Sequence, residues 1–466
     1  MSNAEPGFGA IVERERGLKR TLGAGRLAMI AIGGAIGTGL FLGSGFAISL
    51  AGPAVLVSYA VGALIALLLM GCLAEMTVAH PTTGSFGAYA EYYLGPLAGF
   101  LVRYAYWACI MLAVGTEVTA VALYMHFWYP APPGWLWILV FSGLLITVNA
   151  LSVDVFGAVE YWFSAIKVAA IVLFIALAGW IVLRANGSGP AAPGFHYYLD
   201  HGGFFPKGLW GAWVAVIMAI FSYLSIEMIA VAAGEAQDPA RAVRRAFRST
   251  VLRLVLFYLL SLALILAVVP WSADGTEESP FVRVMRQLAI PGAAAIFNGV
   301  ILVAALSAMN SQLYITTRMM FSLARAGEAP RRFGILSRHG VPVQALLLSS
   351  SGIALATVVS LVAPRSAYIL MVSISAFGAM FTWLMIFVTH YFFRRARAGQ
   401  PPDAFRMAGF PATTLLGAAL MGAVLVTTAF TQEFRATLLF VVPFLGVLCL
   451  AFRYLRHGRI SGDAGT

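Results

Sequence analysis

The chain has 466 residues, of which 61% are hydrophobic and only 11% are charged. Soluble domains carry about 25% charged residues, so this composition excludes an ordinary soluble globular protein and predicts an integral membrane protein. The formal net charge of +11 does not call for nucleic-acid binding, because the basic residues are placed as a membrane topology requires.

Apolar stretches long enough to cross a bilayer recur along nearly the whole chain, and we count about twelve of roughly 20 residues each. They cover residues 27–48, 52–74, 98–126, 135–152, 157–182, 209–233, 249–270, 292–322, 344–363, 367–392, 413–429 and 435–456. The loops between them are short and leave no room for a separate soluble domain. The predicted fold is an all-α polytopic membrane protein.

Basic residues gather before the first span and after the sixth, eighth and tenth spans. They are Arg14, Arg16, Lys19, Arg20 and Arg26, then Arg241, Arg244, Arg245 and Arg248, then Arg325, Arg331, Arg332 and Arg338, and finally Arg394, Arg395, Arg397 and Arg406. The positive-inside rule then predicts that both termini are cytoplasmic. The polar N-terminus runs directly into a full-length span, so no cleavable signal peptide is expected.

The first span is interrupted by glycine. From Gly33 to Gly45, six of thirteen residues are glycine, and each lowers helix propensity by roughly 1 kcal/mol relative to alanine. One interpretation is a helix that opens in mid-membrane, which is tolerated only where the backbone lines a polar cavity or is buried in protein. The other is close helix packing, because the spacings Gly33 to Gly37 and Gly39 to Gly43 are also typical of helix–helix contacts.

The sixth span carries a second interruption, in which Ser222, Ser225 and Glu227 follow Phe221 within an apolar stretch. If spans one to five form one unit and spans six to ten another, each interrupted span opens its unit. Corresponding interruptions in the two halves of a chain indicate the midplane site of a transporter. The pair therefore favours the cavity interpretation of the glycine-rich segment.

Among the charged residues inside the apolar spans, Lys167, Glu117 and Glu227 stand out. Lys167 lies about ten residues into the fifth span, roughly 15 Å along the helix, which is too deep to reach the interface easily. A charge at this depth is costly, so function is the first hypothesis. Because burial penalises its charged form, Lys167 is a candidate proton carrier, and a permanent structural ion pair is the alternative. Glu117 fits ion pairing and proton handling equally, and Glu227 is interpreted as a substrate or gate residue.

Uncharged polar residues inside the spans are expected to form hydrogen bonds between helices, which explain such groups more often than ligand contacts do. They are Asn149, Asn298, Asn310, Ser311 and Gln312. Arg318, His126 and His390 lie near predicted span ends and are expected at the membrane interface.

The three cysteines, Cys72, Cys109 and Cys449, lie within spans and lack the spacing of a disulfide framework or a metal site. We expect them to be small buried apolar residues. The chain also has no nucleophile elbow, no zinc-protease motif and no phosphate-binding loop. No enzymatic activity, cofactor or metal is therefore expected.

Several short motifs, taken in order, resemble the amino acid permeases of the APC superfamily, in particular the bacterial branch that includes aromatic, proline and GABA permeases. Examples are Gly-Ala-Ile-Gly-Thr-Gly at 34–39 and Ala-Gly-Glu-Ala-Gln-Asp-Pro at 233–239. The other segments are residues 17–22, 51–53, 75–76 with Pro81 and 84–86, 95–100, 160–163 with Lys167, and 318–321 with 340–342. The resemblance extends from Leu18 to Arg456.

The resemblance implies a fold of two inverted five-helix repeats with broken helices 1 and 6, followed by two peripheral helices. The repeats would occupy residues 27–182 and 209–392, and the peripheral helices residues 413–456. An extracytoplasmic loop would cover residues 183–208. Residues 1–26, 393–412 and 457–466 would be cytoplasmic.

The resemblance also implies a binding site for an amino acid at the two breaks. Its carboxylate would meet backbone N–H groups at the positive end of a half-helix, and its ammonium group would meet backbone carbonyls. The N–H groups are those of Ile36, Gly37, Thr38 and Gly39. The carbonyls are those of Phe221, Ser222 and Leu224, with Phe221 as an aromatic gate and Ser225 beside them.

Two charged residues match family positions. Lys167 stands where sodium-coupled relatives hold a cation, so a protonated lysine would replace sodium and make the carrier proton-coupled. Glu117 matches an acidic position in the third helix. Ser225 departs from the family, since many relatives have glycine there, and the serine would narrow the side-chain pocket. Further departures are Ala158, Arg103-Tyr104 and Val243-Arg244.

We therefore expect a proton-coupled amino acid symporter of a bacterial cytoplasmic membrane. Its partners would be an amino acid, a proton and the lipid bilayer, with no nucleic acid. An exchanger without net proton coupling is the alternative among transporters, and a membrane amino acid sensor or receptor is the alternative from another class. The helix breaks recognise only the α-amino and α-carboxyl groups, so they do not name the amino acid.

Overall fold

The computed structural model describes residues 7–14, 34, 36–151, 153–184, 193–232, 255–272, 278–288, 290–364, 366–400 and 405–463. These residues form helices and connecting turns, and no strand occurs among them. Ten helical segments of this part are long and apolar enough to cross a membrane. The all-α membrane architecture is thereby confirmed, and parts of the expected first and seventh spans lie outside the described residues.

The helices begin and end as follows. The first half contains α1 (Phe8–Arg14), α3 (Thr38–Phe41), α4 (Gly43–Ala51), η1 (Gly52–Ala54), α5 (Val55–Ala79), α6 (Ser85–Leu94), α7 (Pro96–His126), α8 (Gly134–Leu151) and α9 (Val153–Arg184). The second half contains η2 (Phe195–Tyr198), α10 (Gly208–Tyr223), α11 (Met228–Ala232), an apolar helix Val255–Val268, α13 (Pro280–Gln287), α14 (Ala293–Arg325), η4 (Arg331–Gly334), α15 (Val343–Ser349), α16 (Ser351–Val362) and α17 (Ala367–Ala396). Last come α18 (Ala412–Thr427), η5 (Thr428–Phe430), η6 (Gln432–Phe434) and α19 (Arg435–Asp463).

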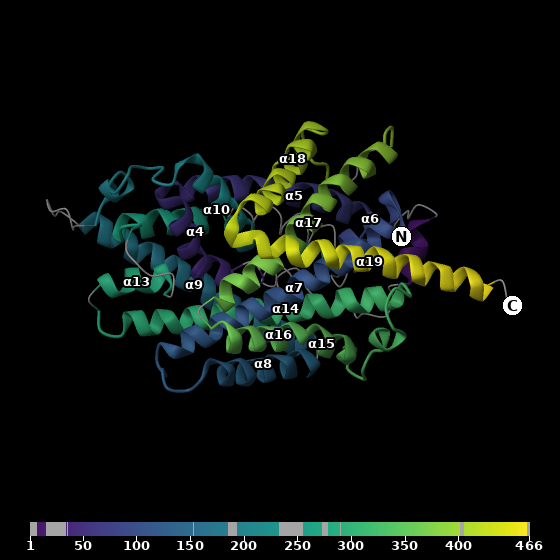
Figure 1. The fold of residues 1–466 in the computed structure, drawn as a ribbon, viewed down its shortest axis with the longest axis horizontal. Coiled ribbons are helices and arrows are strands. Elements are labelled where there is room, and N and C mark those ends of the chain that lie inside the picture. Colours follow the sequence, from purple (N-terminus) through teal and green to yellow (C-terminus); the bar gives the residue numbers. More distant parts are fainter. Residues whose placement is uncertain are drawn as a thin grey trace.

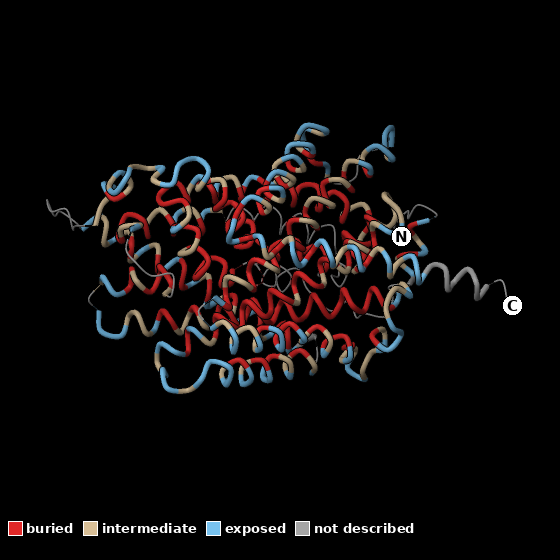
Figure 2. Tube along the Cα trace, in the orientation of Figure 1, coloured by how far each residue is buried: buried red, intermediate tan, exposed pale blue. Residues whose placement is uncertain are grey.

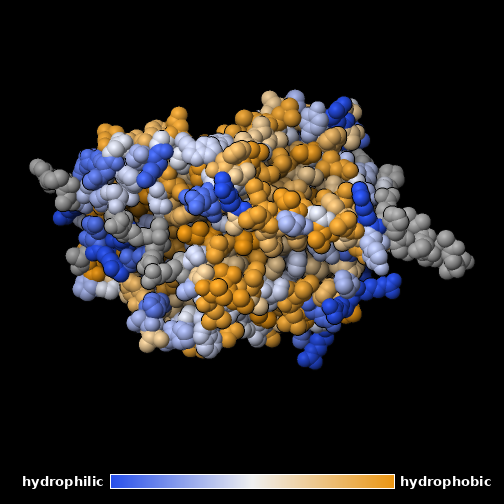
Figure 3. Space-filling model, in the orientation of Figure 1, coloured by the Kyte–Doolittle hydropathy of each residue, from blue (hydrophilic) through white to orange (hydrophobic). Residues whose placement is uncertain are grey.

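Long helices such as α14 and α19 run along the longest axis of the molecule, and α1 and the C-terminal end of α19 lie at the same end (Figure 1). Buried residues concentrate in the middle, whereas exposed residues occupy the outer helices and the loops (Figure 2). On the face shown in Figure 3, hydrophobic side chains cover the central belt and hydrophilic ones gather toward the two ends. This distribution is what a bilayer around the central belt requires.

Two spans lose their helical structure inside the protein. Ile36 and Gly37 lie outside any helix, and Gly37 is extended with φ −132° and ψ −155° before α3 begins at Thr38. In the other span, α10 ends at Tyr223 and α11 begins at Met228, and residues 224–227 form a turn. We call residues 36–37 the first interruption and residues 224–227 the second interruption.

Glycines bring α7 very close to its neighbours. A Cβ atom at Gly352 of α16 would lie 1.9 Å from the carbonyl oxygen of Met111, and one at Gly378 of α17 would lie 2.5 Å from Cβ of Cys109. Small residues allow membrane helices to pack backbone to backbone in this way. Because Cys109 lies in this contact and Cys72 is buried against Met407, both behave as the small buried residues that we expected, whereas Cys449 is only partly buried.

Two residues that we expected at the membrane interface are buried instead. Arg318 is 4% exposed, and its guanidinium carbon lies 3.4 Å from the centre of the Tyr314 ring. His390 is fully buried. The prediction was wrong because hydropathy does not show which side chains face other helices. Arg318 lies over the Tyr314 ring, and His390 lies between Glu75 and Thr414. His126, in contrast, is exposed at the last position of α7, as expected.

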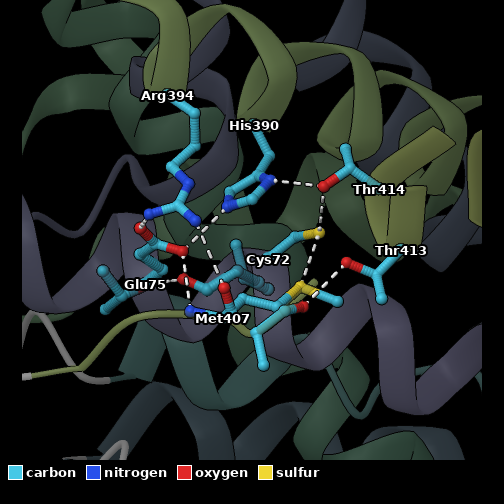
Figure 4. Close-up of polar contacts among 10 residues, drawn as sticks. Cys72, Glu75, His390, Arg394, Met407, Thr413 and Thr414 are labelled. Carbon is cyan, nitrogen blue, oxygen red and sulfur yellow. Dashed lines mark hydrogen bonds and ion pairs between the residues drawn. The ribbon is translucent and has the colours of Figure 1, made fainter. Parts of the chain in front are cut away.

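His390 belongs to a polar cluster that joins α5 to α17 and to the segment before α18 (Figure 4). The Glu75 carboxylate accepts hydrogen bonds from the Arg394 guanidinium (2.9 Å) and from the backbone N–H of Met407 (2.9 Å). His390 Nε2 lies 3.1 Å from Glu75 Oε2, and its Nδ1 lies 3.0 Å from Thr414 Oγ1. Buried charges persist in proteins when they are paired in this way.

The glycine contact between α16 and α7 can be tested by substitution. Gly352→Ala is expected to lower the free energy of unfolding by roughly 1–3 kcal/mol, because the methyl group overpacks a close backbone contact. The measurement is the thermal unfolding midpoint of the purified protein in detergent.

Gly143→Ala is the matched control, since Gly143 lies inside α8 and a Cβ there would have no atom within 4 Å. Replacing this helical glycine is expected to raise the free energy of unfolding by about 0.5–1 kcal/mol. An unfolding midpoint for Gly352→Ala as high as that for Gly143→Ala would contradict the packing described above.

Candidate functional site

The helix ends next to the two interruptions lie against each other. A Cβ atom at Gly39 would lie 2.8 Å from Cα of Ser222 and 3.3 Å from the Phe221 ring. The first turn of α3 therefore touches the last turn of α10 through a bare glycine backbone. Glycine alone permits this approach, which brings the beginning of one short helix beside the end of another.

Lys167, on α9, forms a hydrogen bond with the first interruption. Its Nζ donates a hydrogen bond of 3.0 Å to the carbonyl oxygen of Ile36, and its side chain is fully buried. The charges of Glu160 and Glu117 act on it. The structure thus places this deep lysine at the glycine-rich segment, where the sequence suggested a cavity.

Glu117 holds the other side of the same interruption. Its Oε2 accepts a hydrogen bond of 3.1 Å from the backbone N–H of Thr38, the first residue of α3. A Cβ atom at Gly37 would lie 2.6 Å from Glu117 Oε1 and 2.8 Å from Cβ of Ala308. A carboxylate therefore already lies at one of the N–H groups that we expected a substrate carboxylate to bind.

Glu160 lies seven residues before Lys167 on α9 and is fully buried. It accepts hydrogen bonds from the Ser307 hydroxyl (2.5 Å) and from the Asn310 amide (3.0 Å), both on α14. Asn310 in turn accepts a hydrogen bond of 2.8 Å from Asn149. This chain of polar groups fixes α9 to α14 and α8 behind the lysine.

Of the five uncharged polar residues expected to form hydrogen bonds between helices, the three asparagines are confirmed to do so. Asn149 and Asn310 bind each other, and Asn298 donates to the carbonyl of Tyr124 (2.9 Å). Within the described residues, the Ser311 hydroxyl and the carbonyl oxygen of the Gln312 side chain have no hydrogen-bond partner. These two unpartnered groups are buried on α14, the helix that faces the first interruption at Ala308.

Ser222 joins the two interrupted spans directly. Its hydroxyl donates a hydrogen bond of 2.8 Å to the carbonyl of Gly39, and it lies 2.8 Å from the hydroxyl of Tyr59. Its backbone carbonyl accepts a hydrogen bond of 2.8 Å from Tyr258. The carbonyl of Phe221 accepts one from the N–H of Leu224 (3.2 Å). Two of the three carbonyls expected to receive an ammonium group thus already accept one hydrogen bond each, which leaves each a second lone pair.

Ser225 adopts a backbone conformation that normally requires glycine. Its φ is +80°, in the left-handed region that costs a residue with a side chain. Its hydroxyl is buried and has no hydrogen-bond partner among the residues described. Serine in place of the family's glycine at position 225 therefore strains the backbone, in addition to narrowing the side-chain pocket as the sequence predicted.

Glu227 anchors the second interruption and is fully buried. Its carboxylate accepts hydrogen bonds from Tyr106 of α7 (2.7 Å), from the backbone N–H of Ser225 (3.1 Å) and from the indole of Trp383 of α17 (3.1 Å). All three contacts are with protein groups. They give this residue a positioning role for the turn, and its role as a gate stays a prediction.

The arrangement can recognise a zwitterion and hold a proton. The first N–H groups of a helix lack partners within the helix and carry partial positive charge, and the last carbonyls carry partial negative charge. Here the start of α3 and the end of α10 meet. Glu117 and Lys167 bind the backbone at that point, so a change of charge on either residue acts directly on the site.

Sequence reasoning missed the roles of Glu160, Tyr59, Tyr258 and Trp383. For Glu160 a signal existed, because a spacing of seven residues puts it on the same helix face as Lys167. The two tyrosines and the tryptophan gave no signal, since aromatic residues are common in apolar spans and their partners lie on other helices.

The chain is similar to known proteins along nearly its whole length. A family model described as "Amino acid permease" matches residues 26–458. The chain is 37% identical over 456 residues to a gamma-aminobutyric acid permease of Bacillus subtilis, covering 97% of each chain. It is 39% identical over 447 residues to the amino-acid permease RocC of the same organism, covering 94% of each. It is 36% identical over 438 residues to the aromatic amino acid transport protein AroP of Escherichia coli, covering 94% of this chain and 95% of the other.

Strain at Ser225 can be relieved by substitution. Ser225→Gly is expected to raise the free energy of unfolding by about 1 kcal/mol, because glycine adopts a positive φ without steric cost and removes an unpartnered buried hydroxyl. The measurement is again the unfolding midpoint of the purified protein.

Ser261→Gly is the control, because Ser261 is equally buried with an unpartnered hydroxyl but lies inside the helix Val255–Val268. There glycine is expected to lower the free energy of unfolding by about 0.5 kcal/mol. If both substitutions lower the midpoint equally, Ser225 does not store backbone strain.

Proposed function

The chain belongs to the amino acid permease family, and we propose that it imports an amino acid by proton symport. The family establishes a multi-pass membrane transporter for amino acids. The observation that supports proton coupling is the position of Lys167 and Glu117, which bind the backbone on both sides of the first interruption at Ile36 and Thr38.

In this proposal the substrate binds between the two interruptions. Its carboxylate meets the backbone N–H groups at the start of α3, and its ammonium group meets the carbonyls at the end of α10. The N–H groups are those of Ile36, Gly37, Thr38 and Gly39, and the carbonyls those of Phe221, Ser222 and Leu224, with Ser225 next to them. The buried Phe221 ring, which packs beside Gly39, is the proposed aromatic gate.

Glu117 couples substrate binding to a proton by competition. Its carboxylate uses the N–H of Thr38, which a substrate carboxylate also needs. Two carboxylates at one site repel each other, and this repulsion favours the protonated form of one of them. Proton uptake by Glu117 therefore accompanies substrate binding. Lys167 adds to the coupling, because its positive charge strengthens the hydrogen bond to Ile36, and loss of its proton loosens this turn.

The proposed topology places both termini in the cytoplasm of a bacterial cell. The common end of α1 and α19 in Figure 1 supports one side for both termini, and the basic clusters assign that side to the cytoplasm. The five-helix repeats at 27–182 and 209–392 and the peripheral helices at 413–456 belong to the same proposal. Closure of the interruptions around the substrate, followed by rocking of the repeats, would open the site inward. The turn anchored by Glu227 would act as a gate in this motion.

The alternatives give different fluxes. An exchanger without net proton coupling moves labelled substrate only when substrate is present on the opposite side. A membrane sensor binds substrate without flux. A symporter accumulates substrate in empty proteoliposomes when the outside is more acidic than the lumen.

Lys167→Ala is expected to abolish accumulation of substrate above its outside concentration in such proteoliposomes, because the proton-bearing group at Ile36 is lost. The substrate is the α-amino acid that stabilises the wild-type protein most in thermal unfolding, since binding raises apparent stability. Lys207→Ala is the control, because Lys207 is an exposed lysine just before α10. Full accumulation by Lys167→Ala would remove this residue from the coupling mechanism.

Glu117→Gln is expected to separate transport from coupling. The amide resembles the protonated carboxyl group, so exchange of labelled substrate between lumen and outside should persist and lose its pH dependence, while accumulation driven by a pH gradient should cease. Glu433→Gln, at an exposed glutamate, should leave both activities unchanged. Accumulation by Glu117→Gln equal to that of wild type contradicts the competition at Thr38.

A further inference from the structure

We infer that Arg103 and Tyr104 form a latch that keeps the cytoplasmic end of the carrier closed, by tying α6 and α7 to the turn that follows α14. The inference rests on the proposed function, because it takes the site to open alternately to the two sides of the membrane, and it does not depend on the substrate. Arg103-Tyr104 is one of the departures from the family pattern, and neither residue takes part in the site described above.

Arg103 pairs with two carboxylates from different parts of the chain. Its Nη1 donates a hydrogen bond of 2.7 Å to Glu91 Oε2 on α6 and lies 3.5 Å from Glu328 Oε2 in the turn after α14. The arginine side chain has no exposed surface, and those of Glu91 and Glu328 are only 14% and 11% exposed. Removing one partner from a buried ion pair leaves the other charge uncompensated, which is strongly unfavourable. The guanidinium therefore holds α6 and this turn together.

Tyr104, the next residue of α7, binds the same turn. Its hydroxyl donates a hydrogen bond of 2.9 Å to the backbone carbonyl of Glu328, across 224 residues of sequence. Both residues of the departure thus contact Glu328, Arg103 at the side chain and Tyr104 at the backbone. We call Glu91, Arg103, Tyr104 and Glu328 the cytoplasmic latch, because the proposed topology places this end of α7 on the cytoplasmic side.

Glycines let α6 lie directly against α7 at the latch. A Cβ atom at Gly87 of α6 would overlap with Cγ of Arg103, and one at Gly99 of α7 would lie 2.5 Å from Cβ of Glu91. The aliphatic part of the Arg103 side chain therefore packs on the α6 backbone at Gly87. Any movement of α6 away from α7 breaks this packing together with the ion pair.

α6 lies next to the second interruption, toward the end of the molecule that carries α1 (Figure 1). Phe86 of α6 packs edge-on against the ring of Tyr106, with 4.7 Å between ring centres. Tyr106 in turn donates its hydrogen bond to Glu227 at the second interruption. α6 also contacts α11, which follows that interruption. α6 therefore covers the second interruption on the cytoplasmic side, and opening of the site to the cytoplasm displaces it.

α13 covers the first interrupted span from the opposite end (Figure 1). Ser279, just before α13, donates a hydrogen bond of 2.6 Å to the carbonyl of Phe41 at the end of α3, and the Phe281 ring lies 4.9 Å from that of Phe41. Both phenylalanines are fully buried. In alternating access one end opens while the other closes. Loss of the latch should therefore shift the population toward states that are open at α6 and closed at α13.

The test is hydrogen–deuterium exchange of the backbone amides of α6 and α13 in the purified full-length protein without substrate, because exchange reports how often a segment opens. Arg103→Gln should accelerate exchange in α6 about tenfold, which corresponds to the loss of one hydrogen bond to a charged group, and should slow exchange in α13. Arg103→Lys keeps the charge and should restore much of the wild-type pattern. Arg331→Gln is the matched control, because Arg331 is an exposed arginine just after Glu328.

Tyr104→Phe gives a second measurement if Arg103→Gln does not fold, since it keeps the ring and removes the bond to Glu328. It should shift the two exchange rates in the same opposite directions by a smaller factor. Faster exchange in α6 with unchanged or faster exchange in α13 would mean that the latch only stabilises the fold, and would overturn the inference. Unchanged exchange in both helices also overturns it. These outcomes leave amino acid transport intact, whereas a wild-type protein that binds amino acids without any flux would refute the proposed function itself.

Discussion

A backbone group that lies outside a helix must find a partner inside the protein when lipid surrounds the chain. This constraint governs the centre of the structure. At the first interruption, Lys167 binds the carbonyl of Ile36 and Glu117 binds the N–H of Thr38. At the second, Glu227 binds the N–H of Ser225. Lys167, Glu117 and Glu227 are therefore the groups that make the two interruptions possible. The helices that surround the interruptions hold these side chains in place.

The same residues give the centre an excess of acidic groups. Glu117, Glu160 and Glu227 are buried there with the single cation Lys167, counting the described residues at the two interruptions. Each carboxylate accepts hydrogen bonds from neutral donors, which stabilise it without cancelling its charge. A site of this kind favours the entry of a cationic group and of protons over the entry of a second anion. In the proposed symport, the amino acid brings a carboxylate and the proton removes one negative charge.

Much of the candidate site could be predicted from the sequence, because hydropathy indicates how deep a residue lies in a membrane span. Lys167, Glu117 and the glycine-rich segment stood out against apolar surroundings, and the structure brings them together. What sequence does not contain is the facing partner. Glu227 was expected to be a substrate or gate residue from its position alone, and its contacts with Tyr106 and Trp383, which cross 121 and 156 residues of sequence, could not be predicted. For the same reason, the roles of Tyr59 and Tyr258 were not predicted. The burial of His390 was not predicted either, because its partner Glu75 is 315 residues away in sequence.

The burial of the cysteines has a practical consequence for following the transport cycle. Cys72 and Cys109 are enclosed by protein, and only Cys449 is partly accessible in the structure. A thiol-reactive dye would therefore label one native cysteine, Cys449. Replacing Cys449 would give a protein that the dye does not label. Fluorophores or spin labels introduced one pair at a time, on α1 and α13 for example, would then report the two ends of the molecule without interference from the interior.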